Sequence, residues 1–189
     1  MMDVDTVKAR VERALTRRNR RVVEADGLVP AAVLLGITDP GLRILFVKRS
    51  ERVSRHKGQI SFPGGIVETW DGSRLETALR EAQEEIGLHP DAVEILGSLD
   101  DTETSTQFVI TPFVGLVRGP VTYIPDEREI DRVLQLPLSD FLNPENFRVE
   151  QWEREGQLRP VYFYEVEGEV VWGATARILK EFLDLVFPG

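Results

Sequence analysis

The sequence predicts an α+β fold in which helices and strands form layers around one main core. Strand-like and helix-like stretches follow one another irregularly along the 189 residues, without an internal repeat or a low-complexity linker. Hydrophobic residues make up 42% and charged residues 29%, as in a chain that buries a substantial core. We expect an N-terminal helix and basic tail over residues 1–27, and the main domain over residues 28–189.

The N-terminal segment, residues 5–20, has apolar residues at helical spacing, and Asp5 or Thr6 is placed to cap its start. Its apolar residues are Val7, Val11, Ala14 and Leu15, and its basic residues, with the one that follows, are Lys8, Arg10, Arg13, Arg17, Arg18, Arg20 and Arg21. The basic residues favour a solvated helix face and tail. A surface that contacts an anionic ligand or a second subunit is the alternative.

Strands and turns follow. The expected strands are 31–37, 42–50, 93–99 and 107–117, with a Pro-Gly turn at 38–41 and a short extended piece before a Pro-Gly-Gly loop at 58–65. Pro112 interrupts the last strand and predicts that it is an edge or bulged strand. The remaining expected elements are a short helix and loop at 137–147, a hairpin at 161–173 around Glu167-Gly168, and an amphipathic final helix at 175–187.

A helix over 75–86 carries three carboxylates on one face. Glu81 lies three residues before Glu84 and four before Glu85, and Gly87 is a plausible left-handed stop. Like charges at this spacing repel. Oxygen ligands of high negative charge suit Mg²⁺ or Mn²⁺, which would relieve that repulsion. An ordinary solvated helix face is the alternative reading of the acids alone.

The stretch "GGIVETWDGSRLETALREAQEEIGL" (64–88) resembles the Nudix box of the Nudix hydrolases. The matching residues are Gly65, Arg80, Glu81, Ala82, Glu84, Glu85, Gly87 and Leu88. Two features depart from the pattern: Asp71 replaces the first box glutamate, and eight residues rather than seven separate it from Arg80. Whether Asp71, Glu68 or neither serves the site stays open.

This resemblance implies an α/β/α sandwich with a mixed sheet, and hydrolysis of a diphosphate linked to another group. It implies that Glu81 and Glu85 bind the metal, with Glu84 next and the backbone at Gly65 a further ligand. Arg80 would orient the glutamates by ion pairing.

The preceding stretch "LFVKRSERVSRHKGQISFPGG" (45–65) resembles the extra signature of the coenzyme A diphosphatase branch. The matching residues are Arg49, Ser50, Gly58, Phe62, Pro63, Gly64 and Gly65, while the expected second arginine falls on Ser54 with Arg55 beside it. The substrate-binding residues implied are Arg49, Ser50, Arg55, Lys57 and Gly64. Guanidinium groups suit the phosphates of such a substrate.

We expect the catalytic base on an acidic segment, "IPDEREIDRVLQLPLSDF" (124–141), which also resembles the family. Glu129 fits best, with Asp126 and Glu127 nearby; Asp100, Asp101 and Glu103 form another acidic loop with a weaker claim. Glu81, Glu84, Arg80 and Glu129 are therefore the expected catalytic residues.

The predicted function is metal-dependent hydrolysis of coenzyme A and its derivatives to 4′-phosphopantetheine and adenosine 3′,5′-bisphosphate. One alternative is a Nudix diphosphatase for ADP-ribose or nucleoside diphosphate-sugars, and another is a non-catalytic nucleotide-binding module. A third alternative, a Nudix-like isopentenyl isomerase, needs a cysteine for its chemistry, and the chain has none.

Composition limits the partners to a small-molecule substrate. The net charge of -9 argues against nucleic acid. The longest apolar run, 29–37, is too short to cross a bilayer, and no signal peptide is evident, so we expect a cytoplasmic protein without membrane contact. The absence of cysteine fits that compartment. A monomer and a homodimer stay as alternatives.

Overall fold

The computed structural model describes residues 2–52, 57–154 and 156–188. The helices are α1 (Val4–Thr16), α2 (Arg74–Ile86), α3 (Leu138–Phe141) and α4 (Gly173–Val186), with short 3₁₀ turns η1 (Pro90–Ala92) and η2 (Pro144–Asn146). The strands are β1 (Val29–Thr38), β2 (Arg43–Arg49), β3 (Ile60–Ser61), β4 (Gly64–Ile66), β5 (Val93–Ser98), β6 (Thr102–Glu103), β7 (Phe108–Val117), β8 (Ile130–Pro137), β9 (Phe147–Arg154), β10 (Gln157–Val166) and β11 (Glu169–Trp172). The predicted α+β class is confirmed.

The larger sheet is mixed, as expected. Its central strands β1 and β7 run parallel and pair along their full length, while every other pairing is antiparallel. The other side of β1 is shared by β2 at one end and β4 at the other. Between them, the N–H of Leu34 donates to the carbonyl of Pro63 at 2.8 Å. The Pro-Gly-Gly stretch therefore enters the sheet where β2 and β4 part.

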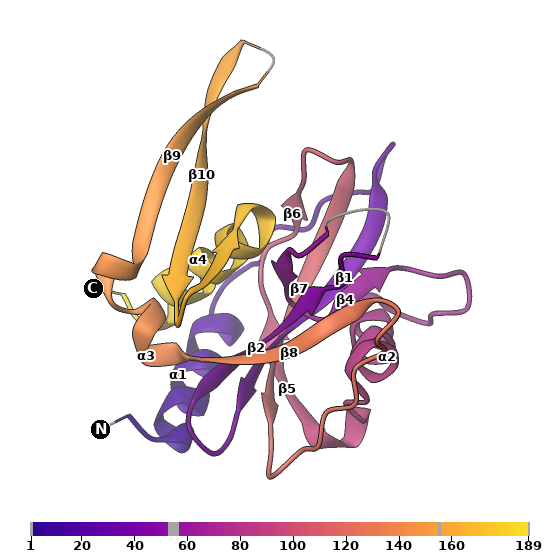
Figure 1. Ribbon diagram of the computed structural model, residues 1–189, viewed down its shortest axis with the longest axis vertical. Helices are drawn as coiled ribbons and strands as arrows, with labels where there is room; N and C mark the ends of the chain where they lie inside the picture. The colour runs from indigo at the N-terminus through magenta and orange to yellow at the C-terminus, as the bar shows by residue number, and fades with distance from the viewer. Residues whose placement is uncertain (1, 53–56, 155, 189) are drawn as a thin grey trace.

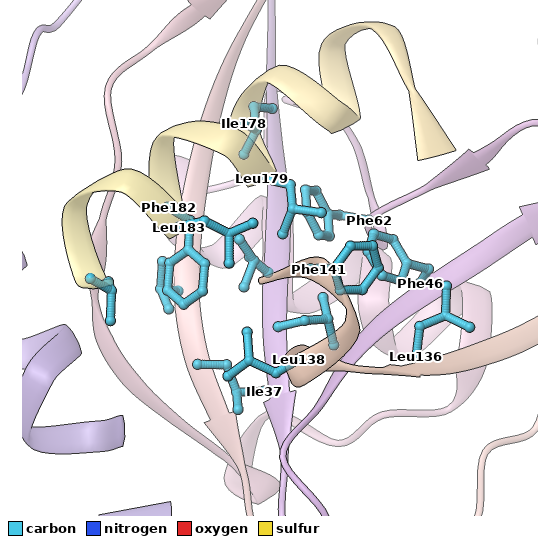
Figure 2. Packing of buried hydrophobic residues seen from close by; sticks show 14 of the residues in the cluster. Ile37, Phe46, Phe62, Leu136, Leu138, Phe141, Ile178, Leu179, Phe182 and Leu183 are labelled. Atoms are coloured by element: carbon cyan, nitrogen blue, oxygen red, sulfur yellow. The ribbon is translucent and has the colours of Figure 1, made fainter. Parts of the chain in front are cut away.

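Helices cover both faces of this sheet, which confirms the α/β/α layering (Figure 1). Helix α2 packs on one face, over β1 residues that include Ala32 and Leu34. Helices α1 and α4 pack on the other face, and Figure 2 shows Phe182 and Leu179 of α4 in the same apolar cluster as Phe46 of β2. Because strands β1 and β2 are buried on both faces, their sequences are almost continuously apolar.

A smaller sheet, in the order β11-β10-β9, leans away from the larger one. The predicted hairpin around Glu167-Gly168 is confirmed as β10 and β11, with φ of 51° and 76° at its turn. Strand β9 is not anticipated, because four of its eight residues are charged and the run lacks a clear alternation. The hairpin of β9 and β10 projects far from the rest of the molecule (Figure 1), and we call residues 147–154 and 156–161 the arm.

The prediction that the strand through Pro112 is an edge or bulged strand is wrong. Strand β7 lies between β1 and β5, and the irregular register falls in β5, between Ile95 and Gly97. Pro112 is accommodated because it faces the gap between β5 and β6, where its carbonyl accepts the N–H of Leu99 at 2.9 Å. Proline has no N–H that could donate to the Leu99 carbonyl in exchange. That carbonyl lies 3.4 Å from Arg20 Nη1 instead.

The N-terminal helix begins and ends earlier than predicted, at Val4 and Thr16, and its cap is Asp3, whose Oδ1 accepts the N–H of Thr6 at 2.9 Å. Of the arginines after it, Arg17 is exposed, whereas Arg18, Arg20 and Arg21 form ion pairs with the body of the protein. Their ion pairs are Arg18–Asp100, Arg18–Glu181, Arg20–Asp101 and Arg21–Glu103. The acidic loop that had a weaker claim as a catalytic base therefore holds the N-terminal segment against the body.

Helix α1 buries Val7, Val11 and Leu15 in the core that it shares with α4. The division of the chain between residues 27 and 28 stays a prediction. Within the described residues, no helix has both the length and the apolar character needed to cross a membrane.

Candidate active site

Helix α2 presents the acidic residues that the sequence singles out, and its prediction over 75–86 is confirmed. Ser73 caps the helix by accepting the N–H of Glu76 at 3.2 Å, and Gly87 ends it in the left-handed region with φ of 69°. The apolar side of the helix, with Ala82 and Ile86, is fully buried against the sheet. The carboxylates consequently lie at the border between core and solvent.

Glu85 is the most enclosed of these carboxylates, with only 4% of the residue exposed. Its Oε2 accepts the N–H of Gly64 at 3.1 Å, and its Oε1 lies 3.6 Å from Arg49 Nη1. Burial raises the pKa of Glu85 to about 8; the Gly64 N–H and Arg49 oppose the rise, while the charges of Glu81 and Glu129 add to it. A buried acid among other acids is typical of a functional site.

Arg80 connects the helix to the loop before it. Its Nη1 donates to Glu81 Oε1 at 2.8 Å and to Glu84 Oε2 at 3.0 Å, while its Nη2 donates to the Ile66 carbonyl at 3.2 Å. Its Nε and Nη2 reach the two oxygens of Asp71 at 2.9 and 3.0 Å. Burial nevertheless raises the pKa of Glu81, against the stabilising effect of Arg80. Arg80 therefore sets the direction of two glutamates at once.

Asp71, one position out of register with the usual box, faces Arg80. Its side chain also accepts hydrogen bonds from the Glu68 N–H at 2.9 Å and the Thr77 hydroxyl at 2.8 Å. The Arg80 guanidinium, with these donors, holds the pKa of Asp71 well below its usual range. Asp71 thus anchors the arginine, whereas Glu68 lines the cavity described below.

The two glycines of strand β4 allow two close approaches. A Cβ at Gly64, where φ is 156°, would lie 2.7 Å from the backbone Cα of Val33 in β1. A Cβ at Gly65 would lie within 2.6 Å of both carboxylate oxygens of Glu81. Gly64 therefore lets β4 pair with β1, and Gly65 lets Glu81 approach the backbone.

The acidic segment after β7 packs on the end of α2. The N–H of Asp126 donates to the Glu85 carbonyl and that of Ile124 to the Ile86 carbonyl, both at 2.9 Å. Arg128 pairs with Asp126 and lowers its pKa to about 2. Glu129 follows, with its side chain 56% exposed and its Oε2 3.9 Å from Arg49 Nη2.

Two cavities meet at these carboxylates. The smaller, about 280 Å³, is lined by Glu81, Glu84, Glu85, Asp126, Arg128 and Glu129. The larger, about 840 Å³, shares the four glutamates and adds a cationic and aromatic wall that includes Arg49, Phe62, Trp70, Phe108 and Trp172. The four glutamates therefore lie where a small polar cavity meets a larger cavity with charged and aromatic walls.

Most of the site residues expected from the sequence line the larger cavity: Arg49, Gly64, Gly65, Arg80, Glu81, Glu84, Glu85 and Glu129. Ser50 is buried in the turn after β2, where its Oγ accepts the N–H of Arg52 at 3.2 Å. Its own N–H donates to the Glu129 carbonyl at 2.7 Å, so it holds the loop that bears Glu129. Lys57 is exposed, and Arg55 lies outside the described residues.

Comparison with known proteins decides the family, since residues 27–158 match the NUDIX domain. The chain belongs to the Nudix hydrolase family. A protein of Citrobacter koseri named uncharacterized Nudix hydrolase NudL is 38% identical over 154 residues, which cover 80% of this chain and 79% of that protein. A protein of the same name from Escherichia coli is 37% identical over 154 residues, with the same coverage of both chains.

The solved structures support the Nudix fold. A MutT/nudix family protein from Enterococcus faecalis superposes with a TM-score of 0.57 and 15% identity, covering 98% of this chain and 75% of that one. The expected Nudix-type sandwich is thereby confirmed. As a Nudix hydrolase, the chain acts on pyrophosphate bonds, and enzymes of this family generally use divalent metal ions.

The Nudix site has the donors for a divalent cation. Carboxylate and backbone oxygens are the ligands that hard cations prefer, and the buried Glu85 lies 3.6 Å from Arg49, its ion-pair partner among the described residues. Across the described ranges, no three carboxylates or imidazoles yet form a closed ligand group. Glu81 and Glu84 instead both accept hydrogen bonds from Arg80.

Sequence reasoning missed two aromatic residues of this Nudix site. Trp70 is 72% exposed in the box loop and Phe108 begins β7, and both line the larger cavity. An exposed tryptophan within a recognised motif is a usable signal for Trp70. Nothing local marks Phe108, because β7 is brought beside the loop by its parallel pairing with β1.

With divalent ions chelated, we expect the Nudix hydrolase to lose stability relative to its Glu85→Gln variant as pH rises from about 4.5 to about 8. The folded pKa of Glu85 lies above its usual value, so the folded state keeps a proton that the unfolded state releases. The stability linked to that proton is complete at low pH and is lost as pH rises through the folded pKa. Thermal unfolding in EDTA at pH 5 and pH 8 measures the difference. Equal differences in Tm at both pH values would contradict the raised pKa.

Proposed function

We propose that this Nudix hydrolase splits the diphosphate of coenzyme A and its derivatives, with Mg²⁺ or Mn²⁺, into 4′-phosphopantetheine and adenosine 3′,5′-bisphosphate. The resemblance over residues 45–65 supports the substrate. The observation that carries the proposal is the position of Arg49 on the wall of the larger cavity, next to the acidic face of α2.

Arg49 has donors to spare for a phosphate. Its ion pairs with Glu85 and Glu129, at 3.6 and 3.9 Å, are longer than hydrogen bonds. Its Nε is buried and has no hydrogen-bond partner among the described residues. A diphosphate at the mouth of the acidic cavity would receive charge-assisted hydrogen bonds from this guanidinium.

The carboxylates of Glu81, Glu85 and Glu84, with the backbone at Gly65, would hold the metal ion. When bound, a divalent cation polarises phosphoryl oxygens and lowers the pKa of an attacking water. Glu129 stands on the wall that both cavities share and is exposed, so its carboxylate would accept the proton of that water. Arg80 keeps the glutamates oriented by its bonds to Glu81 and Asp71.

The larger cavity suits an extended nucleotide substrate. Its volume, about 840 Å³, is that of a small-molecule site. Trp172 stacks on Phe163 on one side, with a ring separation of 6.0 Å and an angle of 8°, and lines the cavity. We propose that an adenine stacks on Trp172 or on the exposed Trp70. The net charge of -9 fits a small-molecule partner rather than nucleic acid.

The test is a substrate panel of coenzyme A, ADP-ribose and a nucleoside diphosphate-sugar, each with Mg²⁺ and Mn²⁺, with products identified by mass spectrometry. We expect 4′-phosphopantetheine and adenosine 3′,5′-bisphosphate from coenzyme A at the highest kcat/KM. Rapid cleavage of ADP-ribose without turnover of coenzyme A would overturn the substrate and leave the hydrolase chemistry in place.

Arg49→Gln should lower kcat/KM for coenzyme A by about 10- to 100-fold, the usual effect of losing a hydrogen bond to a charged group. Arg43→Gln is the matched control, because Arg43 lies at the other end of the same strand and is absent from the walls of both cavities. Equal effects of the two substitutions would remove Arg49 from substrate binding.

A further inference from the structure

Strand β9 is an unprotected edge of the smaller sheet. It pairs with β10 on one side, and no described strand pairs with its other side. In Figure 1 this strand forms the outer side of the arm, away from the larger sheet. Every second residue of an edge strand presents its N–H and C=O outward, and these groups are a template for another strand.

Several devices that block an edge are missing from β9, and its four charged residues are two arginines and two glutamates, which can pair with one another across an edge. The strand has eight residues, holds no proline or lysine, and pairs with β10 in continuous register without a bulge. Apolar side chains on the arm are exposed: Val149 by 46%, Trp152 by 41% and Leu158 by 69%. A hairpin of two strands is marginally stable by itself, so the outer part of the arm would gain from a further strand.

We propose that β9 pairs with β9 of a second copy of this chain, antiparallel, about a two-fold axis at Trp152. In this register Trp152 lies opposite the partner's Trp152, and Glu150 lies opposite the partner's Arg154. By symmetry the glutamate–arginine pair occurs twice. Two sheets of three strands would thereby join into one of six.

The charge pattern of β9 selects this register. A two-fold axis perpendicular to the sheet leaves the two faces of the sheet unexchanged, so opposed residues must have side chains on the same face. This condition is met only when the axis places one residue opposite its own copy. Centred on Gln151, the strands would oppose Arg148 and the partner's Arg154; centred on Glu150 or Glu153, each glutamate would face its own copy. Centred on Val149, Arg148 would face the partner's Glu150, but these two residues already pair within one strand at 3.1 Å, whereas Arg154 has no ion pair among the described residues. Like charges directly opposite are destabilising, and unlike charges are favourable.

Glu150 and Arg154, the two residues of the proposed ion pair, differ in the contacts that they already make. Glu150 is held in place, because its Oε1 accepts from Arg148 at 3.1 Å and its Oε2 accepts from the Trp152 indole at 2.8 Å. Arg154 forms no ion pair with any residue that the structure describes, and it lies at the rim of the larger cavity. The partner's arm would therefore complete an ion pair and stand beside that rim.

Charge reversal tests the pairing, with mass measured by light scattering after gel filtration. At about 100 µM, a concentration that populates dimers of micromolar Kd, the wild type should have twice the mass of the 21.4 kDa chain. Glu150→Arg and Arg154→Glu should each run as monomers, because each change places two pairs of like charges across the axis. An equimolar mixture of the two variants should recover the dimer, since every arginine then faces a glutamate.

Glu153→Arg is the matched control on the same strand. In the proposed register Glu153 lies opposite Gln151, so this variant should remain a dimer. Far-ultraviolet circular dichroism checks that each variant keeps its fold. A monomeric wild type, dimers in both single variants, or a mixture of the variants that stays monomeric would each overturn the proposal.

Discussion

Glu85→Gln should lower the metal-dependent turnover of the protein by about 10³-fold or more, while the fold is kept. Glutamine has nearly the same shape and can still accept the N–H of Gly64, now 3.1 Å from the carboxylate. It supplies no negative charge, however, and a cation site with one buried charge removed loses several kcal/mol of transition-state stabilisation. Initial rates with Mg²⁺ and with Mn²⁺ measure the loss, and thermal unfolding measures the fold.

The matched control for this change is Glu76→Gln on the same helix. Glu76 lies in the first turn of the helix, accepts the N–H of Gly72 at 2.7 Å and lines neither cavity. It should keep wild-type activity. If Glu85→Gln also turned over substrate at the wild-type rate, the assignment of Glu85 as a metal ligand would be wrong.

Alanine at the two neighbouring glycines should separate stability from activity. Gly64→Ala places a methyl group 2.7 Å from the Val33 backbone, which cannot move without disturbing β1. We expect a loss of about 1–3 kcal/mol in the free energy of unfolding. Gly65→Ala instead meets the flexible end of the Glu81 side chain, which can rotate away. Its stability should be close to wild type. Its activity should fall by about 10- to 100-fold, which is the usual effect of removing a contact that orients a metal ligand.

The comparison uses urea unfolding for stability and the dependence of rate on metal concentration for the site. Each glycine is the control for the other. A fall in stability at Gly65→Ala as large as that at Gly64→Ala would show that the backbone of β4, rather than the direction of Glu81, needs the glycine.

The fold and the acidic helix could be predicted because their signals are local. Apolar spacing, a serine cap and a left-handed glycine define α2 within fifteen residues of sequence. The Nudix box gave the class of chemistry by resemblance. Strands β8 and β9 escaped prediction, since their side chains face solvent over much of their length and the apolar pattern is correspondingly weak.

The part of the site that could not be predicted depends on contacts between distant segments. The sequence leaves open whether Asp71 serves the site, and only the side-chain geometry shows that it faces Arg80. The prediction for Pro112 is wrong because a proline in a strand usually indicates an edge, whereas here a gap between the neighbouring strands β5 and β6 accommodates it. Such compensation is a property of the partner segment and leaves no mark in the local sequence.

The hydrogen bonds from Ile124 and Asp126 to the last carbonyls of α2 have a consequence for substrate affinity. They fasten the segment that leads to Glu129 to the helix that bears Glu85 during folding. The backbone of this segment should therefore need less ordering when substrate binds, and ordering a loop is a common entropic cost of association. The main entropic cost of binding should therefore be the loss of conformational freedom of the substrate itself, which is large for a long nucleotide.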